Sequence, residues 1–422
     1  MFDLPAILIG RLVRVTVRMF RRGGGSALPG LVLSKISPGL LSRTLRRFPD
    51  GVLVVTGSAG KSTTTKMLVS IVRAHGKTVF TNSSTANIMQ GFFSSIIQES
   101  NVFGRIPGDV AILEMDEGHA ASLTKRFKPR QVTILNVMDD QLDRFVDPAL
   151  VRDKLAKVAK RAKQALVLNA DDQNILLINK EVRNPKTSWF GLDSEIISAT
   201  KHGLGLAPTY LPVIPRPKTD TEVLSQYETA IEARVGSALV QFELPNRGIH
   251  YSLDSAAALE SARRFLGTDF DAKLAAKTLS ELPPVFARGE TVRINDVDVE
   301  FILVQNPMSF QLNLDNLPKN QEQLMIAIGR DVHDPSWLWT VDLSDLPKVD
   351  VLTGYNYAEM ALRLAYEGVE VKKVMPDLQE AIDEFFSQPA PLFGRRTVIF
   401  SADAMRRMRR SLGLTDPEAV TR

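Results

Sequence analysis

The chain has 422 residues, of which 44% are hydrophobic and 24% are charged, a balance typical of a soluble globular protein with two or three domains. Its formal net charge of +4 is small for this length and by itself indicates no nucleic-acid partner. The sequence contains no Cys, which excludes disulfides, thiolate zinc sites and a cysteine nucleophile and is compatible with a reducing cytoplasm.

The N-terminal stretch, residues 7–20, is apolar but is interrupted by Arg11, Arg14 and Arg18. A signal peptide carries its charges before an uninterrupted apolar core, and no apolar run here is long enough to span a bilayer, so we expect neither. A helix through this stretch has two interpretations that stay open. It packs on the protein with solvated arginines, or it rests peripherally on an anionic membrane face.

From residue 49 onward, apolar runs and helical patterns alternate in the way that predicts βαβ units and a parallel sheet. The alternation stops at 194–235, where four prolines predict an irregular insertion, and it resumes with a strand and an Ala-rich helix up to Pro283-Pro284. We therefore predict a lead-in segment over 1–48 and an α/β domain over 49–284. The expected strands are 52–56, 78–80, 110–115, 132–137, 165–169 and 238–244, and the expected helices are 62–75, 87–99, 119–127, 148–163 and 255–266.

The same pattern restarts after the proline pair and predicts a second, smaller α/β domain of Rossmann-like type over 285–422. Its expected strands lie near 299–304, 323–328, 350–353, 371–374 and 396–400, and its helices near 356–368, 377–387 and from about 402.

A strand-to-helix turn at the start of the first domain predicts a phosphate site. The β-branched run 52–56 is followed by Gly57-Ser-Ala-Gly60 and then by Lys61-Ser62-Thr63, which opens a helix. Such a turn points main-chain N–H groups and the positive end of a helix at one position. Lys61 would reach the outer phosphates and the Ser62 hydroxyl would bind magnesium. The alternative is an ordinary Gly-containing turn with a solvated lysine.

Polar residues follow the next strands at the same predicted edge of the sheet. Three carboxylates, Glu114, Asp116 and Glu117, suit magnesium binding, although a solvated acidic loop would look the same. Asn136 offers an amide that suits an adenine edge, and Asn169 ends a strand whose tip suits ribose or adenine. Arg288, near the predicted domain junction, would either contact a transferring phosphoryl group or form a domain-linking ion pair.

These motifs together resemble the Mur ligases. Gly57-x-x-Gly-Lys-Ser-Thr-Thr, Leu113-Glu-x-Asp-Glu, Asn136-x-x-x-Asp140-Gln-Leu-Asp-Arg and Leu168-Asn-Ala-Asp-Asp occur in the order of the Mur ligase central domain. The opening Arg-rich segment, Asn306-Pro and Asp334-x-Ser-Trp-x-Trp narrow the resemblance to the MurT-type subunits of lipid II isoglutaminyl synthase.

The resemblance implies a reaction, partners and a location. ATP would phosphorylate the α-carboxylate of D-glutamate in the lipid II stem peptide, and ammonia from a GatD-type glutaminase would convert it to D-isoglutamine. The protein would act in peptidoglycan biosynthesis in the cytoplasm, at or near the inner face of the membrane, with ATP and magnesium and without nucleic acid.

The resemblance also implies roles for individual residues. Lys61, Ser62 and Thr63 would bind phosphates, with Ser62 and Glu114 as magnesium ligands. Asn136, Asp140 and Asn169 would line the nucleotide. Asp334 would complete the Cys-His triad of the glutaminase partner, with Asp331 as the alternative.

Two departures from the family pattern leave other functions open. The zinc-ribbon cysteines of the family are absent, so 194–235 would fold without that metal, and the Tyr-Asn-x-Tyr-Asn segment is His250-Tyr-Ser-Leu-Asp254. The alternatives are a stand-alone Mur-like amide ligase acting on another carboxylate and a nucleotide-binding assembly protein with weakened catalysis.

Overall fold

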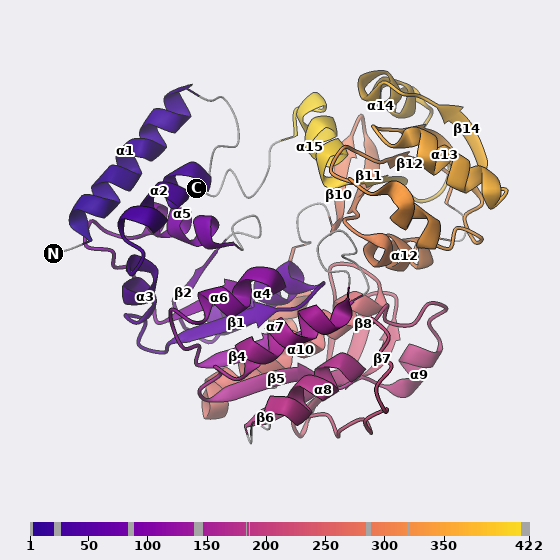
Figure 1. The fold of residues 1–422 in the computed structure, drawn as a ribbon. Helices are drawn as coiled ribbons and strands as arrows, with labels where there is room; N and C mark the ends of the chain where they lie inside the picture. The colour runs from indigo at the N-terminus through magenta and orange to yellow at the C-terminus, as the bar shows by residue number, and fades with distance from the viewer. Residues whose placement is uncertain are drawn as a thin grey trace. The chain divides into compact units, whose positions relative to one another are not determined.

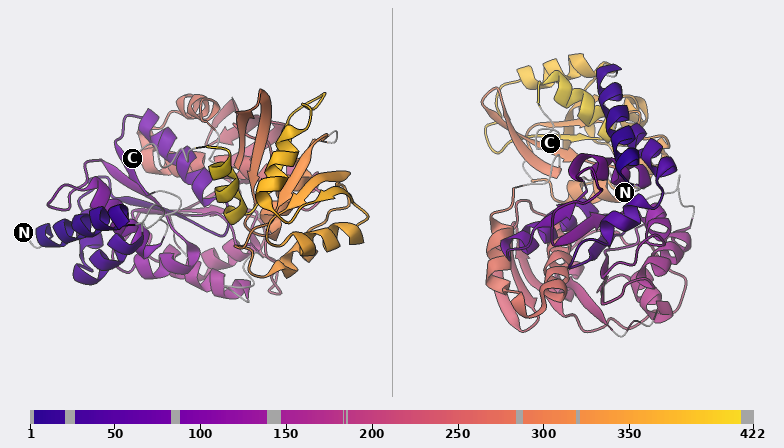
Figure 2. Two further views of the ribbon diagram at one scale, coloured as in Figure 1. Left: turned by 90° about the horizontal axis from the view of Figure 1, so that it is seen from above. Right: turned by 90° about the vertical axis from the view of Figure 1, so that its left-hand side faces the viewer.

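The computed structural model describes residues 3–20, 27–82, 88–138, 147–182, 184, 186–283, 288–318 and 321–414. These residues form two compact units. The first holds nearly all of residues 3–282, and the second holds the residues from 288 onward together with 246–248. Each unit has its own sheet, covered by helices on both faces (Figures 1 and 2).

Three helices precede the first strand: α1 (Leu4–Phe20), α2 (Ala27–Ile36) and α3 (Leu40–Leu45). The predicted N-terminal helix is α1, and the lead-in segment supplies the other two. Ile7, Leu33 and Leu40, one from each helix, are fully buried and belong to the same apolar cluster as helix α5. The N-terminal helices therefore pack on the first unit as part of its core.

The first unit is built on a nine-stranded sheet in the order β2-β3-β1-β4-β5-β6-β7-β8-β9. The strands from β2 to β7 are parallel, and β7, β8 and β9 form an antiparallel meander at one edge. The central strands β1, β3, β4 and β5 are buried along their whole length, as parallel strands covered on both faces should be. The strands are β1 (Val52–Thr56), β2 (Val79–Thr81), β3 (Val110–Glu114), β4 (Gln131–Ile134), β5 (Ala165–Asn169), β6 (Thr187–Leu192), β7 (Thr221–Tyr227), β8 (Ala230–Val235) and β9 (Ala238–Glu243).

Two groups of helices cover this sheet. One face packs against α4 and α10, with α11 beside them, and the opposite face packs against α5 to α8. Side chains from alternate positions of β1, such as Val52 and Val54, belong to the second of these layers. The helices are α4 (Lys61–Ala74), α5 (Met89–Glu99), α6 (Glu117–Leu123), α7 (Pro148–Ala159), α8 (Gln173–Val182), α9 (Ser194–Ser198), α10 (Ile249–Leu266), the short η2 (Gly267–Asp269) and α11 (Ala272–Ser280).

The expectation of an irregular insertion over 194–235 is wrong for the second half of that segment. Residues 221–235 form β7 and β8, which extend the main sheet. Buried residues alternate with more exposed ones along β8, the pattern of a strand with one covered face. The four prolines all lie in the coil between 199 and 220, so their signal stops before the strands begin.

The second unit contains a six-stranded sheet in the order β10-β11-β15-β12-β13-β14, in which only β10 and β11 pair antiparallel. One apolar cluster lies under α12 and α13, and another under α14 and α15. The elements are β10 (Arg288–Ile294), β11 (Val297–Leu303), α12 (Pro307–Asp315), β12 (Leu324–Ala327), η3 (Pro335–Thr340), β13 (Lys348–Thr353), α13 (Tyr357–Tyr366), β14 (Glu370–Val374), α14 (Leu378–Ser387), β15 (Arg396–Phe400) and α15 (Ala402–Ser411).

Among the helices that the model describes, none combines the length and the apolar character needed to cross a lipid bilayer.

Candidate active site

The predicted phosphate turn lies between β1 and α4, at the carboxyl end of the central strand. Gly57 and Gly60 have φ values of 141° and 80°, in the region that favours glycine. A Cβ on residue 57 would lie 3.0 Å from the main-chain nitrogen of Asn136, and one on residue 60 would overlap the Asp254 carboxylate. Gly60 also precedes α4 without giving it a side-chain cap, so the first N–H groups of the helix point toward the turn.

Lys61 is held across the mouth of this turn. Its Nζ donates to the carbonyl oxygens of Gly57 and Ser58, at 2.6 and 2.7 Å, and forms an ion pair with Glu117 Oε2 at 3.0 Å. The Glu117 side chain is only 1% exposed, and its other oxygen, Oε1, has no hydrogen-bond partner among the described residues. An unpaired buried carboxylate oxygen is costly, so this atom marks a position where a ligand or cation would be stabilised.

The three predicted carboxylates all lie at the end of β3, and each has a different environment. The Asn82 side chain holds the main chain of Glu114, accepting from its N–H at 3.0 Å and donating to its carbonyl at 3.1 Å. Asp116 caps α6 by accepting from the Gly118 N–H at 3.0 Å. Glu117 opens α6 and pairs with Lys61.

These residues fit a magnesium ion. The model shows no group of three or more metal-binding side chains within the residues it describes. Mg²⁺, however, usually keeps several waters and takes only one or two carboxylates together with substrate phosphates. Ser62, in the first turn of α4, and the unpaired oxygen of Glu117 supply donors of this kind beside Lys61. The roles of Ser62, Thr63 and Glu114 stay predictions.

Asn136 lies against the phosphate turn. Its Oδ1 accepts from the Ala59 N–H at 2.9 Å and its Nδ2 donates to the Ala59 carbonyl at 3.3 Å. The Asn136 carbonyl also accepts from the Ser58 N–H at 3.1 Å. We expected this amide at an adenine edge, but both of its polar atoms bond to the turn itself, so Asn136 holds the turn in its shape.

Asn169 and Asp172 tie the ends of β4 and β5 together. Asn169 Nδ2 donates to the Leu135 carbonyl at 2.9 Å, and Asp172 Oδ2 accepts from the Val137 N–H at 2.7 Å. Burial raises the pKa of Asp172 to about 7, and the main-chain N–H groups that donate to it oppose the shift only in part. Hydrogen bonds between side chains and main chain thus join the ends of β4 and β5, beside the strand β1 that leads into the phosphate turn.

Two predicted site residues have side chains that the structure does not place. Asp140 lies outside the described residues. The main chain of Arg288 begins β10 in the second unit, but its side chain is likewise outside the described part. Their roles stay predictions.

The structure adds Asp254, which the sequence analysis associated only with an altered substrate segment. This residue lies on α10, is 5% exposed, and its Oδ1 accepts from the Thr64 hydroxyl at 3.1 Å. Because α10 packs against α4, the Asp254 carboxylate lies directly beside Gly60. The departure of the 250–254 segment from the family pattern was the only sequence signal for it.

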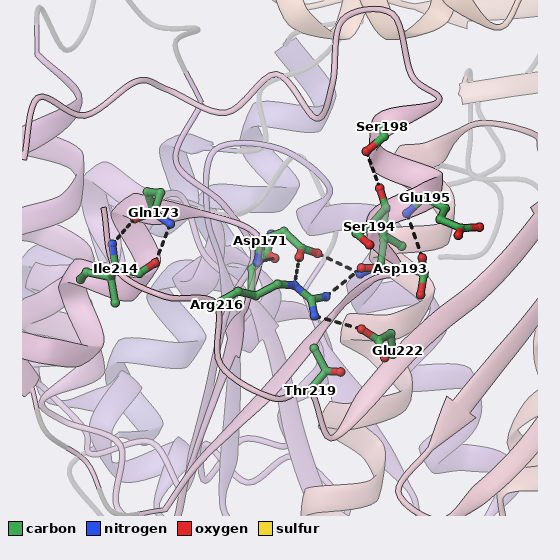
Figure 3. Close-up of polar contacts among 12 residues, drawn as sticks. Asp171, Gln173, Asp193, Ser194, Glu195, Ser198, Ile214, Arg216, Thr219 and Glu222 are labelled. Atoms are coloured by element: carbon green, nitrogen blue, oxygen red, sulfur yellow. Dashed lines mark hydrogen bonds and ion pairs between the residues drawn. The ribbon is translucent and has the colours of Figure 1, made fainter. Parts of the chain in front are cut away.

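A polar network holds the coil between residues 199 and 220 (Figure 3). Arg216 donates to Asp171 at 2.6 Å, to Glu222 at 3.0 Å and to the Leu192 carbonyl at 2.7 Å. Close by, the Gln173 amide makes two hydrogen bonds with the main chain of Ile214. Burial raises the pKa of Asp171 although Arg216 donates to it. These contacts fasten the coil to the ends of β5, β6 and β7.

The two candidate triad aspartates of the second unit differ sharply. Asp331 accepts from the Ser401 hydroxyl and from the N–H groups of Ala402 and Asp403, so it caps α15. Asp334 is exposed, and its hydrogen bonds are local: those from the Ser336 side chain and from the Ser336 N–H, the latter at 3.0 Å, lower its pKa. Of the two, Asp334 is the more exposed, whereas the carboxylate of Asp331 is engaged by the first residues of α15.

Comparisons with known proteins agree with these features. Residues 55–206 match the model of the Mur ligase middle domain, and residues 303–393 match that of the MurT ligase C-terminal domain. The chain is 26% identical to the MurT subunit of lipid II isoglutaminyl synthase from Streptococcus pneumoniae, over 84% of this chain and 85% of that one. It is 24% identical to the Staphylococcus aureus subunit, over 87% and 88%.

Solved structures show the same fold. MurF from Acinetobacter baumannii superposes with a TM-score of 0.68 at 16% identity, over 91% of this chain and 80% of that one. MurF from Thermotoga maritima, solved in complex with ADP, superposes with a TM-score of 0.64 at 20% identity, over 92% and 83%. The chain therefore combines a segment that matches the Mur ligase middle domain with one that matches the MurT ligase C-terminal domain, and it shares the fold of the MurF ligases.

Proposed function

We propose that this protein is the ligase subunit of a lipid II isoglutaminyl synthase. It would use ATP to activate the α-carboxylate of D-glutamate in the lipid II stem peptide, and ammonia would then convert that group to the amide of D-isoglutamine. The observation that carries the proposal is the phosphate turn with Lys61 across its mouth, in a chain whose second unit matches the MurT C-terminal domain.

In the first step, a carboxylate oxygen of the substrate attacks the γ-phosphorus of ATP, and ADP leaves. The N–H groups at the start of α4 and the Lys61 ammonium would bind the phosphates, and Glu117 and the carbonyls of the turn would hold Lys61 in place. Positioning and charge neutralisation account for most of the catalysis in phosphoryl transfer. A bound Mg²⁺ would neutralise phosphate charge, with Ser62, Glu114 and Glu117 as its candidate ligands.

In the second step, ammonia attacks the carbonyl carbon of the acyl phosphate, inorganic phosphate leaves, and the nitrogen loses a proton. We propose that a GatD-type glutaminase supplies the ammonia and that Asp334 completes its Cys-His pair. An aspartate in this role orients the histidine and stabilises its positive charge. The exposure of Asp334 and its low pKa support this assignment over Asp331, which caps α15.

Lipid II is a membrane lipid, so the reaction would take place at the cytoplasmic face of the membrane. The enzyme would contact that face peripherally.

Amidation of lipid II tests the proposal directly. We expect the chain with a glutaminase partner to consume ATP and amidate lipid II with glutamine, and the chain alone to do so with ammonium. Lys61→Met should abolish both reactions, whereas Lys77→Met, which removes a half-buried lysine paired with Asp50, should leave them unchanged. ATP consumption with an amine but without lipid II would instead indicate a stand-alone amide ligase. Nucleotide binding without turnover would indicate an assembly protein and would overturn the proposal.

A further inference from the structure

A strongly basic cavity lies at the amino end of the main sheet, at the opposite end of β1 from the phosphate turn. Its volume is about 510 Å³, and Val52, the first residue of β1, is part of its wall. Six basic side chains line it, and Asp50 is the only carboxylate among the described lining residues. The six are Arg46, Lys125, Arg126, Lys128, Arg130 and Lys163.

The positive charges of this cavity are not neutralised by the protein. Asp50 pairs with Lys77, which lies outside the cavity lining. Arg126 and Arg130 donate to main-chain carbonyls, which carry no net charge. The other four cations make no hydrogen bond or ion pair with the described part of the chain, and all four are exposed. Cations gathered in a concave site raise the local concentration of anions.

An exposed apolar stripe lies on helix α1. Leu8, Ile9, Leu12 and Val15 are between 41% and 66% exposed, although Ala6 and Ile7 on the other side of the helix are buried. Positions 8, 12 and 15 follow the helical repeat, so they lie on one face. Four large apolar side chains along one face of a helix are more than the single exposed apolar residues that a protein surface normally carries.

The loop before β3 contacts α1 and α3 and, through Arg47, the chain next to the cavity lining. Gly104 of that loop lies against Ile7 of α1 and Leu40 of α3, and Phe103 is 58% exposed. The Phe103 carbonyl accepts from Arg47, which follows Arg46 of the cavity lining. Figure 1 shows α1 and α3 on the left, the side on which β1 begins.

We propose that α1, Phe103 and the basic cavity form one surface that docks on an anionic phospholipid bilayer. The apolar stripe would enter the interface, and the cavity would take a phosphate-bearing headgroup. An apolar helix face gains free energy at the headgroup boundary, and basic residues beside it add attraction to anionic lipid. Neither signal alone gives stable binding, but the two together do. This inference rests on the proposed function only in that lipid II is membrane-bound, and the docking itself needs no catalysis.

Vesicle co-sedimentation of the full chain tests the proposal. We expect binding to vesicles that contain phosphatidylglycerol, no measurable binding to pure phosphatidylcholine, and weakening by salt. Lys125→Glu with Lys128→Glu should weaken binding at least tenfold, because each basic residue near an anionic surface contributes roughly a factor of five. Leu8→Ser with Leu12→Ser should weaken it comparably. All these side chains are exposed, so the variants should fold, which thermal unfolding would check.

Two matched controls make the result decisive. Arg406→Glu with Arg407→Glu changes the net charge by the same amount on exposed positions of α15, and Leu362→Ser removes an exposed leucine from α13. Both should bind vesicles as the unchanged protein does.

Equal loss in the control variants, or equal binding to neutral vesicles, would overturn the proposal. So would calorimetric binding of inorganic pyrophosphate to the cavity without any vesicle binding. Retained ATP affinity in every variant would show that the phosphate turn is intact, so failure of docking and failure of the proposed function are distinguishable.

Discussion

Asn136→Ala should weaken nucleotide binding through the phosphate turn rather than through the base. The substitution removes the hydrogen bonds at 2.9 and 3.3 Å by which the amide holds both polar atoms of Ala59. At about 0.5–1.5 kcal/mol each, their loss amounts to about 1–3 kcal/mol. The unclamped turn would have to be reordered when phosphates bind, so the affinity for ATP should fall by roughly 5- to 150-fold.

Comparing two ligands separates this role from base recognition. Calorimetric titration with ATP and with tripolyphosphate, both in the presence of Mg²⁺, should show the same loss for each, because both ligands use the turn. If Asn136 contacts adenine instead, ATP binding would weaken while tripolyphosphate binding stayed unchanged, and that result would refute the reasoning. Asn101→Ala is the matched control, because the Asn101 side chain also makes two hydrogen bonds with the main chain, accepting from two N–H groups at 3.0 Å each, in a loop that lies away from the turn.

Three further predictions concern single aspartates and one arginine. Asp334→Asn should abolish glutamine-driven amidation and spare ammonium-driven amidation, whereas Asp331→Asn should lower thermal stability; loss of both activities in Asp334→Asn would contradict the triad role. Arg216→Met should destabilise the first unit by about 2–3 kcal/mol in urea unfolding, since Asp171 is left buried and Arg216 is itself partly solvated; adding Asp171→Asn should recover most of the loss. The pKa of Asp172 is about 7 in the folded chain and 3.8 without burial, so the folded state holds the extra proton between these values. As pH rises from 5 to 8, the free energy of unfolding of the unchanged protein should therefore fall by about 2–3 kcal/mol relative to that of Asp172→Asn. If the two proteins instead gave parallel curves of stability against pH, the result would count against the buried carboxyl.

The central strands and the phosphate turn were predictable because their signals are local. A buried parallel strand is a continuous apolar run, and Gly57 and Gly60 mark backbone angles that other residues rarely adopt. The expected strand 52–56 is β1, and the helix expected from residue 62 is α4. The same local signal failed at the edge of the sheet, where 221–235 was expected to be irregular. One-sided strands depend on partners distant in the sequence, and the nearby prolines concealed their alternation.

The sequence predicted what kind of chemical group each side chain offers, but it did not predict which atoms that group contacts. An amide after a strand was expected to bind a nucleotide, but whether Asn136 faces a ligand or Ala59 depends on how β4 lies beside β1. Asp331 and Asp334 lie three residues apart and look equivalent in the sequence. They differ because the first N–H groups of α15, some seventy residues later in the chain, donate to Asp331.

The sequence by itself determined the α/β class, the glycine-containing turn between β1 and α4 and the resemblance to the Mur ligases, because each depends on short patterns of apolar, glycine and charged residues. Only the tertiary structure decided that Asp254 lies beside Gly60, that Glu117 holds Lys61, and that basic residues from three separate loops share one cavity. The physical reason is that a parallel sheet brings the ends of distant strands together, and electrostatic interactions between side chains depend on distance in space rather than along the chain.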